Sequence, residues 1–191
     1  MTAVYDIVLV RHGETEWSAS GRHTSFTDLA LTLHGREQAV AARERLHAWQ
    51  FALVLASPRR RARDTCELAG LAAGCEVDDD LAEWNYGEYE GRTTAEIRER
   101  DPGWTIFTGD PPGGETAAQV SARADRVLAR AVKADGPVAL FSHGHFLRVL
   151  GARWIGLPAA EGRLLGLDTA TLSVLGHERD QQVLREWNSR G

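Results

Sequence analysis

The sequence predicts an α/β fold, a three-layer α/β/α sandwich built around a mainly parallel central sheet. Short apolar runs that are typical of strands alternate along the chain with longer segments in which apolar residues recur at helical spacing. The chain has 191 residues, of which 43% are hydrophobic and 26% charged. That length and composition suit a single domain over residues 1–191, with a core that needs no metal or disulfide staples.

The expected strands are short runs rich in apolar side chains. A continuous apolar run such as 7–10 indicates a strand that is buried on both faces, as parallel strands between two helix layers are. The last two runs flank a turn at 176–180 and predict a hairpin. The expected strands cover residues 6–10, 51–56, 76–77, 137–141, 170–175 and 182–187.

Helices are expected between these strands because apolar residues recur on one side of each intervening segment. In one of them, Ala39, Leu46 and Trp49 belong to a single apolar stripe among charged residues. Prolines and glycines crowd 101–114 and predict a loop there. The expected helices cover residues 35–50, 59–70, 115–133 and 145–155.

The charge of the chain argues against several classes of protein. The formal net charge is −5, from 22 basic and 27 acidic residues, and a mildly acidic chain is a poor general binder of nucleic acids or membranes. No apolar run reaches the roughly 18 residues that a membrane span needs, and no secretion signal is visible at the N-terminus. Two cysteines are too few for a disulfide framework. We therefore expect a cytoplasmic protein with no nucleic-acid or membrane partner.

Polar clusters rich in arginine and histidine follow three of the expected strands, at 11–15, 57–61 and 142–145. Because the carboxyl ends of parallel strands share one edge of a sheet, we expect these side chains to meet there, where such sheets bind ligands. Lys133 is the only lysine, so an anion site here is built from guanidinium groups, whose forks grip phosphate bidentately. The pattern predicts a cationic pocket for a phosphorylated ligand.

Each cluster has a structural alternative when it is taken alone. A single histidine after a strand, such as His12, is more often structural than catalytic, and the arginines at 59–61 alone are typical of a solvated helix start. Positive charge near a helix N-terminus is unfavourable by roughly 0.3–1 kcal/mol per residue, however, which suggests that one of these arginines serves an anion. Three such clusters at the ends of expected parallel strands favour the functional interpretation.

One segment carries a clear resemblance to a known family: Leu9-Val10-Arg11-His12-Gly13-Glu14-Thr15 resembles the signature of the histidine phosphatase superfamily, the phosphoglycerate-mutase-like proteins. The resemblance continues along the chain in the family order. The other matching segments lie within 28–35, 57–62, 81–91, 114–115 and 142–144. The resemblance implies the phosphoglycerate-mutase-like fold.

The resemblance also implies a role for each residue of the expected pocket. His12 would be the nucleophile that becomes phosphorylated, and Glu83 would be the proton donor. Arg11, Arg61 and His143 would hold the phosphoryl oxygens. A further set would contact the substrate, namely Ser18, Thr24, Ser25, Gly144 and Tyr86. Neither a metal nor a cofactor is implied.

Two positions depart from the family pattern. Ser18 stands where the family usually has asparagine, and its hydroxyl can donate a hydrogen bond but reaches less far. Arg59 stands where an apolar residue is usual, and we expect it to face solvent. His23 and His145 are further candidates for the pocket, with structural roles as the alternative.

Phosphoryl transfer explains why these residue types are found together. Imidazole is a good nucleophile only when neutral, and its ordinary pKa is about 6.5. Positive charge from Arg11 and Arg61 would keep His12 neutral, and a backbone carbonyl near Gly13 would hold one ring nitrogen so that the other can attack. Fixed arginines would stabilise the spread negative charge of the loose transition state without a metal.

The sequence favours a phosphatase over a mutase, which would return the phosphoryl group to its intermediate instead of passing it to water. Family mutases generally carry a longer, basic segment where this chain has 91–114, whose only cations are three arginines. Segments 17–24 and 83–91 resemble the branch that holds acid phosphatases and sugar bisphosphatases. We predict a phosphomonoesterase that acts on a small phosphorylated metabolite, such as a sugar phosphate or bisphosphate. The alternatives are a bisphosphoglycerate-dependent phosphoglycerate mutase and a non-catalytic phospho-ligand-binding module. The sequence leaves a monomer and a homodimer both open.

Overall fold

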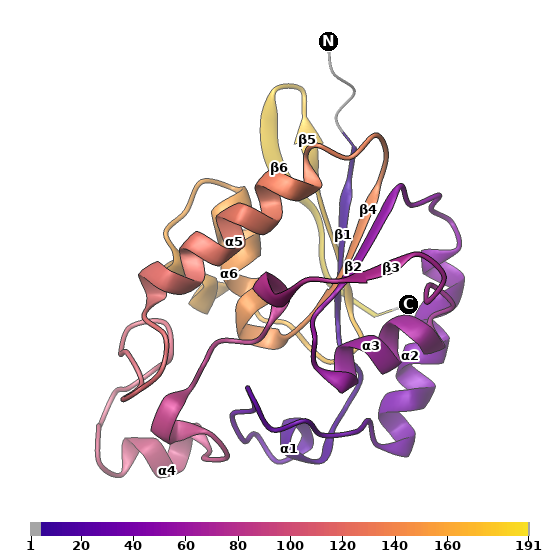
Figure 1. Cartoon of the computed structure of the whole chain (residues 1–191). Coiled ribbons are helices and arrows are strands. Elements are labelled where there is room, and N and C mark those ends of the chain that lie inside the picture. Colours follow the sequence, from indigo (N-terminus) through magenta and orange to yellow (C-terminus); the bar gives the residue numbers. More distant parts are fainter. Residues whose placement is uncertain (1–4, 191) are drawn as a thin grey trace.

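A single six-stranded sheet forms the centre of the computed structural model, which describes residues 5–190 (Figure 1). The strands are β1 (Ile7–Arg11), β2 (Leu53–Ala56), β3 (Cys75–Val77), β4 (Val138–Ser142), β5 (Leu172–Glu178) and β6 (Gln181–Ser189). Their spatial order is β3-β2-β4-β1-β5-β6. The first four in this order run parallel to one another, whereas β5 and β6 are antiparallel to their neighbours. The predicted mainly parallel sheet and its final hairpin are confirmed.

Helices lie against both faces of this sheet. They are α1 (Glu16–Ala19), α2 (Leu33–Leu46), α3 (Arg60–Leu68), α4 (Thr94–Arg98), α5 (Ala117–Ala131) and α6 (Gly144–Trp154). Helices α2 and α3 cover one face, and α5 and α6 cover the other (Figure 1). The predicted three-layer α/β/α sandwich is therefore confirmed. In the part of the chain that the structure describes, no helix has the length and apolar character needed to cross a membrane.

The residues of β1 show why the sheet needs both helix layers. Ile7 and Leu9 point to one side and belong to the apolar cluster that α5 and α6 complete. Val8 and Val10 point to the other side and belong to the cluster of α2 and α3. All four side chains are buried, and each contributes about 1.5–3 kcal/mol when it is removed from water. A continuous apolar run is thus required, as the sequence pattern predicts.

The first long helix differs from its predicted bounds at both ends. It begins earlier because the side chain of Thr32 accepts a hydrogen bond from the Gly35 N–H at 3.0 Å and caps the first turn. It ends at Leu46, so that Trp49 lies beyond the helix. The Trp49 ring stacks on Phe51 with 6.2 Å between ring centres, which explains its apolar character outside the helical stripe.

Several short elements are absent from the sequence prediction. Helices α1 and α4 are too short to show apolar periodicity, and capping boxes define them instead: Thr15 with Ser18, and Thr93 with Glu96. Short 3-10 helices cover 79–81, 87–89 and 159–164. Strand β5 also continues to Glu178, so the final hairpin has a shorter turn than predicted.

Candidate active site

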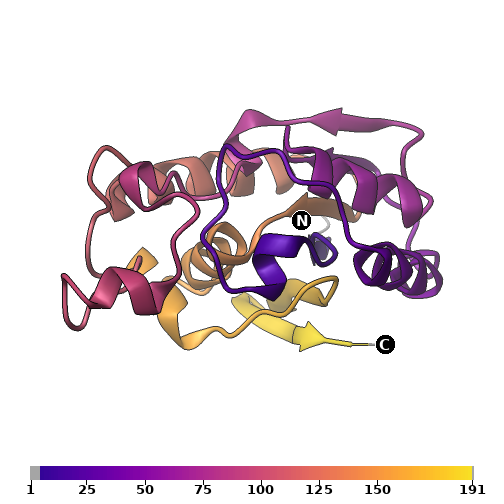
Figure 2. The same cartoon turned by 90° about the horizontal axis from the view of Figure 1, so that it is seen from below.

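The polar clusters that follow β1, β2 and β4 meet at one edge of the sheet, as the sequence predicts. Figure 2 looks onto this edge. Arg11 ends β1 and pairs in register with Ser142 at the end of β4. The His12 N–H donates to the Ser142 carbonyl at 3.0 Å, and the Ser57 N–H, just after β2, donates to the Phe141 carbonyl at 2.9 Å. These backbone bonds fix the start of each cluster relative to the others.

Two glycines allow the loop after β1 to pack directly against the start of α2. A Cβ on Gly13 would lie 2.2 Å from the Gly35 carbonyl oxygen, and a Cβ on Gly35 would lie 2.1 Å from the Glu14 carbonyl oxygen. On the other side, the Gly13 N–H donates to Thr65 Oγ1 of α3 at 3.0 Å. The loop that carries His12 is therefore fixed between α2 and α3.

His12 is buried and held in one tautomer. Its Nδ1 lies 2.7 Å from the Gly13 carbonyl oxygen, which can only accept, so Nδ1 carries the proton and Nε2 keeps its lone pair. The predicted carbonyl partner is confirmed. Burial, followed by the positive charges of Arg61 and Arg11, holds the pKa of His12 well below its ordinary value, although the bond to Gly13 opposes this shift. A neutral ring with one free nitrogen meets the requirement for a nucleophilic imidazole.

The two arginines nearest His12 are both tied to backbone carbonyls. Arg61, in the first turn of α3, is fully buried and donates from Nη1 to the Thr27 carbonyl at 3.1 Å and from Nη2 to the Thr24 carbonyl at 3.0 Å. Arg11 donates from Nη1 to the Leu167 carbonyl at 2.5 Å. These bonds to the backbone hold both guanidinium groups in place.

His143 completes the group around His12. Its ring centre lies 5.2 Å from that of His12, and its Nε2 lies 2.7 Å from Ser57 Oγ. With that hydroxyl as donor, the His143 Nδ1 carries the ring proton. Within residues 5–190, Nδ1 of His143 and Nε of both Arg11 and Arg61 are buried without a hydrogen-bond partner. An unpaired buried polar group costs roughly 1–3 kcal/mol, so these three atoms remain available to a hydrogen-bond acceptor that reaches them.

Glu83 is held beside His12 by backbone N–H groups. Its carboxylate accepts from the Trp84 N–H at 2.9 Å, the His145 N–H at 3.1 Å and the Phe146 N–H at 2.8 Å. The last two donors belong to the first turn of α6, where a helix favours negative charge. Because Glu83 is only 7% exposed, its carboxyl group has a fixed position in the wall of the site.

A hollow of about 260 Å³ opens beside His12. Seven of the ten predicted site residues line it: Arg11, His12, Ser18, Thr24, Glu83, Tyr86 and Gly144. Arg61 and His143 are fully buried and do not line it. Ser25 does not line it either and lines a neighbouring hollow, where its backbone N–H donates to Glu90 at 2.8 Å.

The polar groups of Ser18 and Tyr86 already have partners within the protein. Ser18 Oγ accepts from the Thr15 N–H at 2.8 Å and donates to the Thr15 carbonyl at 3.0 Å, so this hydroxyl caps α1. Tyr86 is buried, and its hydroxyl lies 2.6 Å from Nδ1 of His145. Burial raises the pKa of Tyr86 well above its ordinary value, so the phenol stays neutral and can donate.

Some residues of the hollow are absent from the sequence prediction. Arg22, Thr94, Arg148 and Leu167 line it together with the two candidate histidines, His23 and His145. Arg148 follows Gly144 by one helical turn on α6, and this spacing is a signal that the sequence does contain. Leu167 comes from an irregular segment, for which no pattern in the sequence indicates a place in the site.

The expectation that Arg59 faces solvent is wrong. Its guanidinium lies over the ring of Phe26, 5.0 Å from the ring centre. Its Nε is buried and the residue as a whole is half-buried, and its partner Phe26 lies in a loop that is distant in sequence. Within residues 5–190, no group of three or more His, Cys, Asp or Glu side chains is placed to hold a metal ion.

The fold and this cluster of histidines and arginines at the edge of the sheet place the chain in a known class of enzymes. The chain belongs to the histidine phosphatase superfamily (branch 1), whose model matches residues 7–190.

An acid phosphatase of Mycobacterium tuberculosis is 46% identical over 182 residues, which cover 93% of this chain and 89% of that protein. Sedoheptulose 1,7-bisphosphatase of Saccharomyces cerevisiae is 36% identical, with 78% of this chain and 67% of that protein covered. A solved mycobacterial glucosyl-3-phosphoglycerate phosphatase in complex with VO3 superposes with a TM-score of 0.86 at 33% identity, covering 97% of this chain and all of that one. The chain is therefore a histidine phosphatase enzyme, and the resemblance drawn from its motifs is confirmed.

Proposed function

We propose that this phosphatase hydrolyses monoesters of small phosphorylated metabolites through a phosphohistidine on His12, with Glu83 as the proton donor. The observation that carries the proposal is the state of the His12 ring. Its Nδ1 is bound to the Gly13 carbonyl, its Nε2 is free, and its pKa is depressed by burial and by neighbouring guanidinium groups. These features support a nucleophile rather than a structural histidine.

In the first step, Nε2 of His12 attacks phosphorus in line with the ester oxygen. The N–P bond forms as the P–O bond breaks, and the leaving alkoxide takes a proton from the Glu83 carboxyl group. Glu83 must enter this step protonated, although its three backbone N–H partners favour the ionised form. The buried donors on Arg11, Arg61 and His143 would hold the three remaining phosphoryl oxygens. The departing product is an alcohol, and the enzyme is left phosphorylated on the ring.

In the second step, water attacks the phosphorus atom of the phosphohistidine. The Glu83 carboxylate, now without its proton, accepts a proton from that water as the P–N bond breaks. Inorganic phosphate leaves, and His12 returns to its neutral tautomer with Nδ1 bound to Gly13. The cycle is closed because Glu83 regains the proton that it gave to the alcohol.

The lining of the hollow supports a small, polar substrate. Its volume of about 260 Å³ is modest, and most of its lining side chains are charged, hydroxylic or imidazole groups. Arg22 and Arg148 add positive charge to that of Arg11, which suits an ester with further hydroxyl or anionic groups. Sugar phosphates and sugar bisphosphates have this chemistry, and the yeast relative is named for one of them.

The test is a turnover screen of phosphorylated metabolites, with p-nitrophenyl phosphate as a general substrate. We expect steady release of phosphate and a phosphoenzyme that is labile to acid and stable to base. His12→Ala should abolish both signals.

The absence of turnover in a folded wild-type chain would favour a phospho-ligand-binding module. Conversion of 3-phosphoglycerate to 2-phosphoglycerate that requires 2,3-bisphosphoglycerate would favour a mutase. Loss of turnover on addition of a chelator would contradict a metal-free mechanism.

A further inference from the structure

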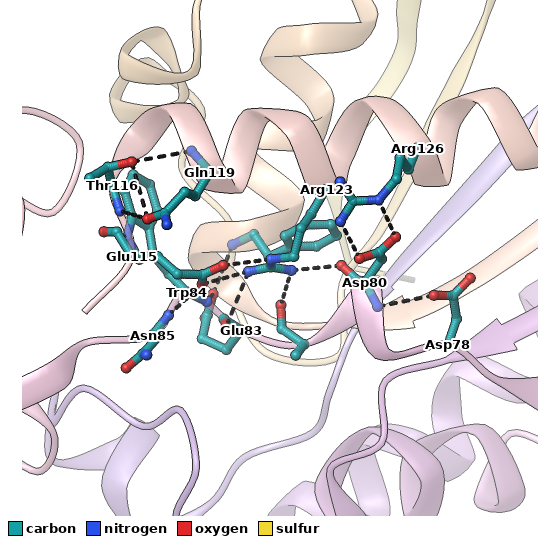
Figure 3. Close-up of polar contacts among 12 residues, drawn as sticks. Asp78, Asp80, Glu83, Trp84, Asn85, Glu115, Thr116, Gln119, Arg123 and Arg126 are labelled. Atoms are coloured by element: carbon teal, nitrogen blue, oxygen red, sulfur yellow. Dashed lines mark hydrogen bonds and ion pairs between the residues drawn. The ribbon is translucent and has the colours of Figure 1, made fainter. Parts of the chain in front are cut away.

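An arginine on α5 extends toward the segment that contains Glu83 and binds the chain that leads to it (Figure 3). Arg123 Nη1 donates to the Asp80 carbonyl at 2.6 Å and to the Ala82 carbonyl at 3.0 Å, and its Nη2 reaches the Glu83 carbonyl at 3.4 Å. The side chain of Arg123 is only 12% exposed. The peptide segment just before Glu83 is therefore bound to one guanidinium group.

Glu115 binds the chain on the other side of Glu83. Its Oε2 accepts from the Asn85 N–H at 2.9 Å, and its backbone carbonyl accepts from Trp84 Nε1 at 2.8 Å. The same carboxylate receives two bonds from Arg123, from Nε at 2.8 Å and from Nη2 at 2.9 Å. The Arg123–Glu115 pair thus holds the backbone both before and after Glu83 (Figure 3).

Arg123 also contacts the element that holds the Glu83 carboxyl group. Its guanidinium lies over the Phe146 ring, 4.8 Å from the ring centre, and the Phe146 N–H donates to Glu83 Oε1. Neither Arg123 nor Glu115 lines the hollow beside His12. Both line the neighbouring hollow of about 320 Å³. The pair therefore lies outside the hollow beside His12, and Glu83 lines both hollows.

We propose that the Arg123–Glu115 ion pair is a positioning device that sets the place of the Glu83 carboxyl group relative to the leaving oxygen. This inference rests on the proposed function. A largely buried ion pair is a poor source of stability, because the cost of removing both charges from water offsets their attraction. Its bidentate geometry does fix direction, and a misplacement of about 1 Å at a reacting group can cost about 100-fold in rate.

The test compares two substitutions on the same helix. Arg123→Lys keeps the positive charge but loses the planar fork that binds Glu115 and the carbonyls together. Arg126→Gln is the matched control, because the exposed Arg126 side chain binds the half-buried Asp80 carboxylate and makes no bond to the backbone around Glu83. Glu115→Gln is a second probe, which keeps the shape of the side chain and removes its charge.

Two esters report whether proton donation has changed. An alkyl phosphate needs a proton on its leaving oxygen, whereas p-nitrophenolate leaves well without one. We expect Arg123→Lys and Glu115→Gln to lower kcat/KM on glycerol phosphate, which reports only the step that forms the phosphoenzyme, by about 10- to 100-fold. On p-nitrophenyl phosphate we expect a loss of kcat/KM of at most about threefold, because its leaving group needs no proton. Arg126→Gln should match the wild type on both.

A second measurement separates positioning from folding. In a Glu83→Gln background there is no proton to deliver, so adding Arg123→Lys should cause no further loss of kcat/KM on glycerol phosphate. A further loss there, or an equal loss of kcat/KM on both esters in the single variant, would overturn the inference and leave the proposed function intact. A wild-type chain that hydrolyses neither ester would overturn both together.

Discussion

Gly13→Ala tests the close backbone contact that fixes the loop carrying His12. The added Cβ would lie 2.2 Å from the Gly35 carbonyl oxygen, about 1.2 Å short of the 3.4 Å at which ordinary contact begins. The neighbouring group is backbone, so no side chain can turn aside, and the loop or the start of α2 must move by about 1 Å. Overpacking of this kind costs about 1–3 kcal/mol of folding free energy.

The same movement should also lower kcat, because it displaces the His12 ring. His12 donates to the Gly13 carbonyl, so a shift of that carbonyl by about 1 Å turns the ring away from the line of attack, and such a misplacement costs about 100-fold. We expect kcat on p-nitrophenyl phosphate to fall by about that factor. Urea unfolding should show a loss of about 1–3 kcal/mol.

Gly166→Ala is the control for this substitution, because a Cβ at Gly166 would meet nothing within 4 Å. It should leave both kcat and the free energy of unfolding close to those of the wild type. The reasoning would be refuted by a Gly13→Ala enzyme with wild-type kcat and wild-type stability. Such a result would mean that the loop and α2 are not in contact in solution.

Three further predictions concern the buried histidines, the phosphate donors and the α1 cap. Burial lowers the pKa of His23 to about 4, below the ordinary 6.5 of the unfolded chain. Acidification from pH 6.5 toward 4 therefore protonates the unfolded chain first and lowers the free energy of unfolding by about 1.4 kcal/mol per pH unit. His23→Gln should remove that part of the slope in urea titrations, and an unchanged slope would contradict the assignment. Arg61→Met should weaken inhibition by inorganic phosphate by about tenfold or more and raise the pKa of His12 in an NMR titration, because a buried charge and its hydrogen bonds are lost. Ser18→Ala should leave phosphate inhibition unchanged and cost about 1 kcal/mol of stability, because its hydroxyl binds Thr15. A large loss of phosphate affinity would show instead that Ser18 binds the ligand.

The main features of the fold could be predicted from the sequence because they follow from repeating patterns. The apolar runs of β1 and β4 and the stripe of α5 show the period of each element directly. The polar residues at the strand ends then indicate where a ligand binds, as for His12 and its Gly13 carbonyl partner. Short helices such as α1 were not predictable in this way, because one capping box rather than a period defines them.

Contacts between irregular segments were also beyond the sequence pattern. Leu167 reaches the hollow, and its carbonyl meets Arg11 across 156 positions of the chain. Arg59 is covered by Phe26, a loop residue that no local pattern connects with the start of α3. The apolar pattern around Arg123 predicts a helix, but no feature of the sequence indicates that its side chain binds the Asp80 carbonyl. Such contacts depend on how distant segments pack in the folded protein, which local sequence patterns do not determine.

The guanidinium of Arg61 belongs to two parts of the enzyme at once. Together with burial, its positive charge lowers the pKa of His12, and it also binds the carbonyls of Thr24, which lines the hollow, and of Thr27. A change of this loop for a new substrate would therefore also change how Arg61, a phosphoryl-binding group in the proposed mechanism, is held. Substrate selectivity and kcat are thus coupled through Arg61, so substitutions in this loop that change the preferred substrate should also change kcat.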